Sequence, residues 1–263
     1  MSGFQKKYFY LIKIQYLGYR FHGWQKQPDL KTLHLMVDKT LRFVFDGKPF
    51  KTLASGRTDA MVSALDAAIE LFVEEKLEDE NEFLNGFNYN LPQDIRALSI
   101  TKVDKRFNII NQSKQKEYLY VFAFGNKFHP FCAPIMTTFL DDLDIEIMKQ
   151  GAKLFEGHHN FKSYCFRPTD NGEYVRRVDL CEIVENTQLT ASFFPETSYI
   201  FRIVGKGFMR NQIRLMVGAL VLLGKGEVTL EFIERTLKMD SDIKLEYIAP
   251  PSGLILNKVD FEI

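Results

Sequence analysis

The chain has 263 residues, of which 46% are hydrophobic, 26% charged and 14% aromatic. This composition is typical of a globular protein with a sizeable core, and it argues against a disordered chain, collagen or a coiled coil. The longest apolar run, from Leu215 to Leu223, is nine residues long and falls far short of the roughly 20 residues that a membrane helix needs. The amino terminus has no cleavable apolar stretch, so we expect a cytoplasmic protein with no membrane partner.

Basic and acidic residues number 34 each, but they are unevenly distributed along the chain. Residues 1–60 contain 11 basic and 4 acidic residues, whereas residues 61–100 contain 2 basic and 9 acidic ones. A second basic segment, residues 201–225, has no acidic residue and contains Arg202, Lys206, Arg210, Arg214 and Lys225. Two interpretations remain open at this point, solvated surfaces or contact with a polyanion.

Apolar periodicity predicts strands and helices in alternating groups. Strict alternation predicts a strand over residues 8–16, and apolar positions 33, 36, 37, 41 and 44 predict a helix over residues 32–45. Alternating aromatic residues predict a strand over residues 117–124. The rest of the chain repeats the mixture: an acid-capped helix over 141–155, strands over 175–184 and 199–204, a helix after Gly207, and a closing strand from Leu254.

This order of elements predicts an α+β fold with largely antiparallel strands rather than a doubly wound parallel sheet. We place an amino-terminal α+β half at residues 1–105 and a carboxy-terminal half at residues 106–263. For residues 60–76 two patterns predict different secondary structures. Helix propensity favours a helix there, whereas the alternation of Ile69, Leu71 and Val73 with their neighbours favours a strand over residues 67–74.

No metal site or dinucleotide site is expected. The five histidines and three cysteines show neither an HExxH pattern nor paired Cys/His spacing. The glycine-rich segment 205–210 lacks the third glycine of a dinucleotide fingerprint, because Arg210 stands there. A helix start flanked by Lys206 and Arg210 would still favour an anion, and an ordinary glycine turn before a core helix is the equal alternative.

The segment Gly56-Arg57-Thr58-Asp59-Ala60 is the most informative short stretch. Most such sequences would be a turn in which Thr58 or Asp59 caps a helix. The closeness of Arg57 to Asp59 also favours a carboxylate kept ionised by a guanidinium, and such a carboxylate could act as a nucleophile or base.

Five segments together resemble the TruA-type tRNA pseudouridine synthases. GRTDA at 56–60 is similar to the catalytic signature of that family, and the four other segments follow the family's order. They are FHGWQKQP at 21–28, KEYLYVF at 116–122, GFMRNQIRLMVGAL at 207–220 and APPSGLIL at 249–256.

The resemblance implies a cofactor-free isomerase that converts uridines of the tRNA anticodon stem-loop to pseudouridine. Asp59 would be the catalytic carboxylate, attacking either the base or the sugar, and Arg57 would fill the space that the extruded uridine leaves. Tyr118 would lie against the uracil, Arg214 would pair with Asp59, and Leu254 would line the pocket.

The resemblance also implies RNA contacts and a particular fold. The basic segments become candidate phosphate contacts, including Lys206 and Arg210, and Trp24 and Phe21 become candidate stacking groups, although burial is the stronger explanation for Trp24. The family fold has two ferredoxin-like halves joined in one sheet with helices mainly on one face, which makes residues 67–74 a strand. A homodimer is expected from the resemblance alone.

Five positions depart from the family pattern: Leu17, Met61, Ser63, Ile110 and Asn160. The family usually has Gly at position 61, His at position 63, and an arginine near position 110. Two alternatives therefore stay open: a pseudouridine synthase for another RNA or another uridine, and a noncatalytic RNA-binding or RNA-folding protein.

Overall fold

The structure is a computed structural model that describes residues 4–169 and 171–262. These residues contain ten strands, mostly antiparallel, and five α-helices, which confirms the predicted α+β class. The chain forms two compact units: the first extends to Lys114 and resumes at Leu256, and the second is Gln115–Ile255. Within the described residues, no helix is long and apolar enough to span a membrane.

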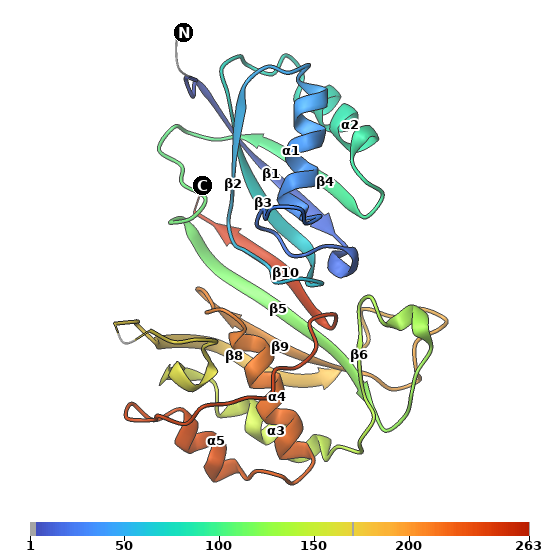
Figure 1. Ribbon diagram of the computed structural model, residues 1–263, viewed down its shortest axis with the longest axis vertical. Coiled ribbons are helices and arrows are strands. Elements are labelled where there is room, and N and C mark those ends of the chain that lie inside the picture. Colours follow the sequence, from blue (N-terminus) through green and yellow to red (C-terminus); the bar gives the residue numbers. More distant parts are fainter. Residues whose placement is uncertain (1–3, 170, 263) are drawn as a thin grey trace. The chain divides into compact units, whose positions relative to one another are not determined.

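The first unit is a sheet with two α-helices (Figure 1). Its strands run in the order β4-β1-β3-β10, and β2 pairs with β3. The elements are β1 (Tyr8–Tyr16), α1 (Leu33–Val44), β2 (Phe50–Ala54), β3 (Ser63–Val73), α2 (Glu80–Asn90), β4 (Ile95–Lys102) and β10 (Leu254–Phe261), the last of which begins at the end of the second unit.

Strand β3 shows why helix propensity fails for residues 60–76. Its carboxy-terminal part, from Ile69 to Val73, is paired with β1 on one side and with β2 on the other. Val73, for example, is paired with both Tyr8 and Phe50. Every residue from Ala67 to Val73 is buried. A central strand covered on both faces reads as a continuous apolar run, and tertiary burial therefore overrides the preference of alanine and leucine for helix. The strand that the resemblance implied is confirmed.

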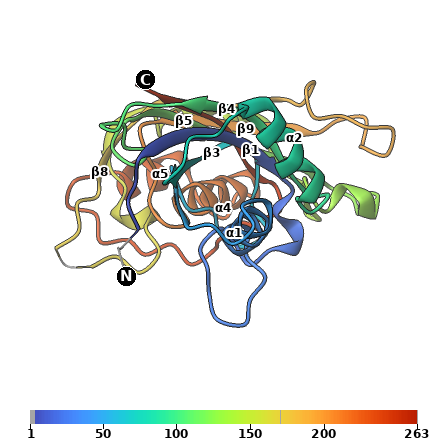
Figure 2. The same ribbon diagram turned by 90° about the horizontal axis from the view of Figure 1, so that it is seen from above.

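The two helices of this unit begin at side-chain caps. Helix α1 has the predicted position, and the Thr32 hydroxyl accepts a hydrogen bond from the Leu35 amide at 3.4 Å. Helix α2 was not predicted because its sequence is mostly polar and only Phe83 and Phe87 are buried. The helices meet through aromatic rings: Phe45, which follows α1, stacks on Phe83 with centroids 5.3 Å apart. Figure 2 shows α1 along one side of β1 and β3.

The connection that follows β4 covers the other face of the sheet. Val103, Phe107 and Ile109 pack there against Leu11 and Ala68. The buried Glu70 carboxylate on β3 accepts a hydrogen bond from the Ile109 amide at 3.1 Å, and burial raises the pKa of this carboxyl.

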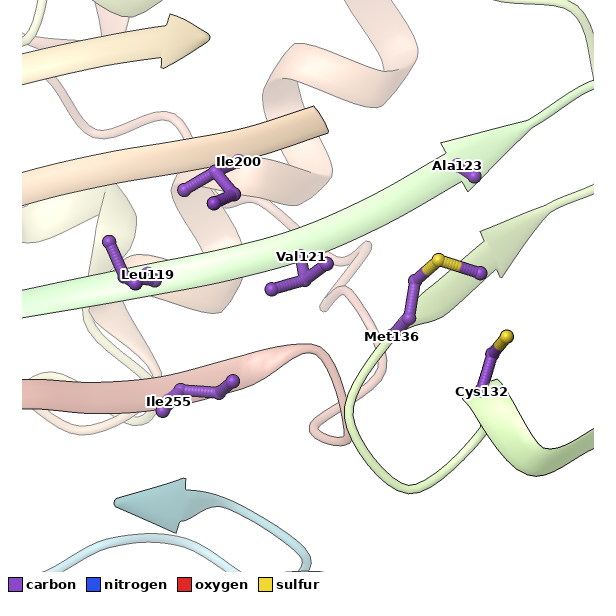
Figure 3. Close-up of a cluster of buried hydrophobic side chains, with 7 residues drawn as sticks. All are labelled: Leu119, Val121, Ala123, Cys132, Met136, Ile200 and Ile255. Atoms are coloured by element: carbon purple, nitrogen blue, oxygen red, sulfur yellow. The ribbon is translucent and has the colours of Figure 1, made fainter. Parts of the chain in front are cut away.

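The second unit contains a sheet of order β5-β9-β8-β7, with β6 parallel to β5. Its core includes a cluster on one face of β5 and neighbouring elements (Figure 3), formed by Leu119, Val121, Ala123, Cys132, Met136, Ile200 and Ile255. The elements are β5 (Ser113–Phe124), β6 (Thr137–Phe139), α3 (Ile145–Lys153), β7 (Gly157–Asn160), β8 (Val175–Glu185), β9 (Tyr199–Gly205), α4 (Gln212–Gly224) and α5 (Leu230–Thr236).

Two helix starts in this unit differ from the prediction. Helix α3 begins after Asp144, whose carboxylate accepts from the amides of Glu146 and Ile147, whereas Asp141 forms an ion pair with Lys225. Helix α4 begins at Gln212 rather than directly after Gly207, because Asn211 adopts a left-handed conformation with φ of 57°. The residues 206–211 are therefore a loop.

Candidate active site

The GRTDA turn (Gly56–Ala60) lies in the first unit, between the end of β2 and the start of β3. The Val62 amide donates to the Asp59 carbonyl at 3.2 Å, which closes a tight turn, and Met61 has a φ of 65°. This left-handed conformation is costly for a residue with a Cβ atom and free for glycine. It gives a physical reason for the glycine that the family usually has at position 61.

Residues from three earlier positions fix the turn by hydrogen bonds. The Tyr16 hydroxyl lies 3.0 Å from the Thr58 hydroxyl in a buried contact. The Trp24 amide donates to the Thr58 carbonyl at 3.0 Å, and the Met61 amide donates to the Phe21 carbonyl at 3.1 Å. These bonds connect the turn to β1 and to the segment 21–28, so the backbone on both sides of Asp59 is constrained.

Two glycines allow the backbone to approach the turn closely. A Cβ atom on Gly18 would lie 1.9 Å from the Val62 carbonyl oxygen, and one on Gly23 would lie 2.8 Å from the Thr58 carbonyl oxygen. No side chain fits at either distance. The Gly18 amide also donates to the buried Ser63 hydroxyl at 2.9 Å, so one of the departures from the family pattern has a structural function here.

Phe21 and Trp24 are 2% and 4% exposed, and their rings lie within the first unit. Trp24 stacks on His34 with ring centroids 5.6 Å apart and is tilted against Tyr16 at 6.1 Å. Burial lowers the pKa of His34 and outweighs the opposing effect of Asp38. The position of Trp24 agrees with the burial explanation, and it is the backbone groups of Phe21 and Trp24 that are hydrogen-bonded to the turn.

Arg57 is hydrogen-bonded to a neutral side chain. The exposed Arg57 guanidinium donates to the side-chain oxygen of Gln25 at 2.7 Å. The local ion pair expected from the closeness of Arg57 and Asp59 is therefore not what this guanidinium forms. Asp59 itself is partly exposed.

Tyr118 lies on β5, in the second unit. Tyr118 is paired with Ile203 of β9, and its ring meets Phe208 edge-to-face with centroids 5.5 Å apart. The alternation of a strand places Tyr118 and Tyr120 on the face opposite the cluster of Figure 3. The partly exposed Tyr118 ring is thus supported from one edge by Phe208.

Arg214 on α4 is oriented by two acceptors. Its Nε donates to the Ala249 carbonyl at 2.7 Å, and one terminal nitrogen donates to the Asn211 side chain at 3.2 Å. The next carbonyl, that of Pro250, accepts from the buried Tyr120 hydroxyl at 2.8 Å, and burial raises the pKa of Tyr120. The segment 249–256 therefore connects Arg214 to the Tyr118 face of β5.

Leu254 is the first residue of β10, belongs to the second unit, and is buried, with 6% of its surface exposed. The neighbouring Gly253 permits close contact with β5, because a Cβ atom there would lie 2.6 Å from the Val121 carbonyl oxygen. The Gly253 carbonyl accepts from the Val121 amide at 2.8 Å. The backbone around Leu254 is thus fixed against β5.

Apart from Arg214, the cations of the segment 201–225 fall into two groups. Arg202 forms ion pairs with Glu117 at 2.9 Å and Glu182 at 3.4 Å, and Lys225 forms one with Asp141 at 2.7 Å. These pairings neutralise both residues, which corrects the expectation that the whole segment is available to phosphates. Lys206 and Arg210, in the loop before α4, are exposed.

Some of the backbone groups at the start of α4 are hydrogen-bonded within the same segment of the chain. The Met209 amide donates to the Gln212 side chain at 2.9 Å, while the Gln212 amide donates to the Met209 carbonyl at 3.1 Å. This reciprocal pair resembles a capping box. Of the two interpretations of the glycine-rich segment, these bonds favour a structural turn for its backbone, and its exposed cations remain available to a ligand.

Sequence reasoning missed the residues that shape the turn, namely Gly18, Gly23, Gln25 and the hydroxyl of Tyr16. Gly23 and Gln25 lie in the recognised segment 21–28, which was the one available indication. Nothing in the spacing shows that these residues contact positions 57–62. Within residues 4–169 and 171–262, no three histidine, cysteine, aspartate or glutamate side chains form a group that could hold a metal ion.

Comparison with known proteins gives a consistent result. A family model described as tRNA pseudouridine synthase matches residues 152–262. The tRNA pseudouridine synthase A of Pseudothermotoga lettingae is 32% identical over 258 residues, with 96% of this chain and 99% of that protein covered. The tRNA pseudouridine synthase A of Listeria monocytogenes is 31% identical over 254 residues with the same coverage, and that of Dictyoglomus thermophilum is 29% identical over 251 residues, with 95% of this chain and 98% of that protein covered.

Proposed function

Because the chain belongs to the tRNA pseudouridine synthase A family, and is therefore an isomerase that converts uridine in tRNA to pseudouridine, we propose that its target uridines lie in the anticodon stem-loop. The support for this finer assignment is the order of the five segments that resemble the family, with GRTDA complete at residues 56–60. The relatives named above are matched over nearly their whole length, so the resemblance extends beyond the turn itself.

Asp59 is proposed as the catalytic carboxylate that begins cleavage of the glycosidic bond. Its support is the constrained turn, in which hydrogen bonds to Thr58 and Met61 fix the backbone on both sides of the partly exposed Asp59. A fixed backbone lowers the entropy that the carboxylate loses when it reaches the reacting carbon. The reaction is an isomerisation, so the base must stay bound while its new carbon–carbon bond to the sugar forms.

Arg57 is proposed to enter the space left by the extruded uridine. The guanidinium is exposed and is hydrogen-bonded to one neutral side chain, Gln25, which it can exchange for RNA at little cost. Extrusion of a stacked base costs a few kcal/mol, and an inserted planar guanidinium that stacks between the neighbouring bases offsets part of that cost.

Tyr118, Leu254 and Arg214 are proposed to complete the pocket. The partly exposed Tyr118 ring would lie against the uracil face, and Leu254 would exclude water. Arg214, oriented by the Ala249 carbonyl and by Asn211, would pair with the Asp59 carboxylate. Phe21 and Trp24 are proposed to support the turn rather than to stack on RNA, because both rings are buried.

The first experiment tests the carboxylate. Purified protein is incubated with unmodified tRNA, and pseudouridine is mapped at nucleotide resolution. We expect Asp59→Asn to lose all detectable product while tRNA still binds, because the amide lacks the negative charge of a nucleophile or base. The matched control is Asp29→Asn, an exposed aspartate in the same unit whose positive φ suits asparagine. Product formation by Asp59→Asn would remove Asp59 from the mechanism.

The same map decides between the anticodon stem-loop and another position. One observation favours the alternative: Ile110, where the family usually has an arginine nearby, is 60% exposed, so an expected cation is missing from the surface. Pseudouridine outside the anticodon arm would establish the alternative, and pseudouridine within it would support the proposal. Tight binding of tRNA without product at any position would instead indicate a noncatalytic RNA-binding protein.

We also propose, from the family resemblance, that the protein is a homodimer and acts in the cytoplasm. Light scattering after size-exclusion chromatography measures the first directly, because one chain has a mass of 30.6 kDa. A monomer mass at micromolar concentration would contradict the dimer. Fractionation of cells that express the tagged chain tests the location.

A further inference from the structure

Two arginines of the second unit share one aromatic ring. The guanidinium carbons of Arg167 and Arg210 each lie 5.1 Å from the centroid of the Phe166 ring. They are therefore no farther apart than twice that distance. The Phe166 amide donates to the Arg210 carbonyl at 3.2 Å, so the loop before α4 and the segment after Tyr164 are joined by their backbones as well.

These arginines differ from their neighbours in their partners. Arg202 and Arg177 each form ion pairs, with Glu117 and Asp179 respectively, at 2.9 Å and 2.8 Å. Within the described part of the chain, neither Arg167 nor Arg210 forms an ion pair with a carboxylate, and both are exposed. A partly exposed ring that attracts a guanidinium leaves its nitrogen–hydrogen groups free to bind an anion.

Backbone strain independently marks the same place. Among residues 4–169 and 171–262, five residues other than glycine have a positive φ: Asp29, Asp46, Met61, Arg167 and Asn211. Aspartate and asparagine adopt this conformation comparatively readily, whereas methionine and arginine rarely do. Met61 follows the GRTDA turn, and Arg167, with φ of 55°, adjoins Phe166. Strain of this kind concentrates at functional sites, where the surrounding structure compensates for it.

From these observations we propose that Arg167 and Arg210 together bind a backbone phosphate of the tRNA, and that Phe166 positions them. This inference rests on the proposed function and deepens it by naming a contact to the substrate. Guanidinium groups bind phosphate oxygens through two parallel hydrogen bonds, and stacking on a ring reduces the freedom that each side chain loses on binding. Arg210 directly precedes Asn211, whose side chain accepts a hydrogen bond from Arg214, so the proposed phosphate contact adjoins a residue that orients Arg214.

The test measures tRNA binding separately from catalysis. Fluorescence anisotropy with labelled tRNA gives the dissociation constant over a series of salt concentrations, and product formation gives kcat and KM. We expect Arg167→Ala and Arg210→Ala each to weaken binding about tenfold, as for the loss of a charged hydrogen bond. Each should make the negative slope of log affinity against log salt shallower by about one. KM should rise while kcat stays unchanged.

Arg235→Ala is the matched control, because Arg235 is an exposed arginine in the last turn of α5. It should leave the affinity and the salt slope unchanged. Thermal unfolding of every variant, followed by circular dichroism, verifies that the fold is intact. If Arg167→Ala and Arg210→Ala bind tRNA as Arg235→Ala does, with the same salt slope, the phosphate site is refuted.

Phe166→Leu tests the positioning role. In the otherwise unchanged protein it should weaken binding a few-fold, and in the Arg167→Ala, Arg210→Ala background it should have no further effect, because it acts through the two guanidinium groups. An equal loss in both backgrounds would show that Phe166 acts independently of the arginines. Failure of the proposed function has a different signature, namely tRNA that binds with the expected salt dependence but carries no pseudouridine in the anticodon arm.

Discussion

The GRTDA turn of the first unit and the loop 206–211 of the second unit differ in how completely their surroundings fix them. The turn is hydrogen-bonded to Tyr16 and Trp24, and Gly18 packs directly against the backbone of Val62, two residues after the turn. The loop contains Gly207, for which an added Cβ atom would meet nothing within 4 Å, and its Arg210 lies against a ring rather than a carboxylate.

This difference follows the chemistry that each region is proposed to perform. A reacting carboxylate must be placed to within a fraction of an ångström, which requires packing on every side. A phosphate contact depends on net charge and tolerates rearrangement, so exposed guanidinium groups on an aromatic support are sufficient. Substitutions near the turn should therefore reduce stability and catalysis together, whereas those of the exposed loop cations Lys206 and Arg210 should change affinity alone.

The largest expected effect comes from Gly18→Ala. The new methyl group would lie 1.9 Å from the backbone carbonyl oxygen of Val62, so β1 or the turn must shift. We expect the free energy of unfolding to fall by about 3 kcal/mol or more, and product formation to be lost in the molecules that still fold. Urea unfolding followed by the fluorescence of Trp24, the one tryptophan of the chain, reports on this unit directly.

Two glycines provide controls for this prediction. Gly86, in the middle of α2, has open space around it, and Gly86→Ala should raise the stability of the first unit by about 0.5–1 kcal/mol because alanine favours helix. Gly207→Ala, in the open loop, should leave unfolding by circular dichroism nearly unchanged. If Gly18→Ala were as harmless as Gly207→Ala, the contrast between the two regions would be wrong.

A smaller effect is expected from Tyr16→Phe. It removes the hydroxyl that lies 3.0 Å from the Thr58 hydroxyl and leaves the ring in place beside Trp24. The loss of one buried hydrogen bond costs about 1 kcal/mol. We expect kcat to fall with little change in tRNA affinity, because Thr58 adjoins the proposed catalytic residue.

Tyr89→Phe is the matched control for the hydroxyl, since Tyr89 is 91% exposed on α2. Both variants can be compared by urea unfolding with Trp24 fluorescence and by single-turnover kinetics. An unchanged stability and an unchanged kcat for Tyr16→Phe would show that the buried contact does not orient the turn.

The same two regions show how far the sequence determines this fold. Strand β1 and helix α1 were predicted with bounds within a residue of those observed, because each combines a strict period with a recognisable end, such as the Thr32 cap. Strand β2 and helix α2 were missed, since a strand of five residues and a helix with few apolar positions carry little periodicity. For strand β3 the local alternation and the helix propensity disagreed, and only the pairing with β1 and β2, which is not local, decides for a strand.

The candidate site likewise contains residues that the sequence predicts and residues that it does not. Asp59, Arg57, Tyr118 and Arg214 are predicted as site residues because they lie in segments that resemble a known family. The residues that orient them could not be identified, because contacts such as Tyr16 to Thr58, 42 positions apart, depend on how strands pair. The pairing of Arg202 with Glu117 is equally non-local, with 85 positions between them, and it explains why counting cations overestimated the surface available to phosphate.

The last and smallest expected effect is a dependence of the first unit's stability on pH through His34. Its imidazole stacks on Trp24 and lies 2.8 Å from the Thr52 hydroxyl. The charged groups around it are Asp38, at 3.6 Å, and Lys26, which forms an ion pair with Asp38. Burial lowers the pKa of His34 below its ordinary value of 6.5, with Asp38 opposing and Lys26 adding to that effect.

A lowered pKa in the folded state means that the unfolded chain binds the proton more readily. The stabilisation from a neutral His34 is therefore complete above pH 6.5 and decreases as the pH falls toward the folded-state pKa. His34→Gln has no such proton, so its free energy of unfolding should decrease less than that of the wild type between pH 8 and pH 5.5. Urea unfolding followed by Trp24 fluorescence measures the free energy of unfolding of both proteins at each pH. The contributions of all other titrating groups cancel in the difference between the two proteins. Equal slopes, or a steeper decrease in His34→Gln, would mean that the imidazole beneath Trp24 accepts a proton without cost, and that this side of the turn is less tightly packed than its hydrogen bonds indicate.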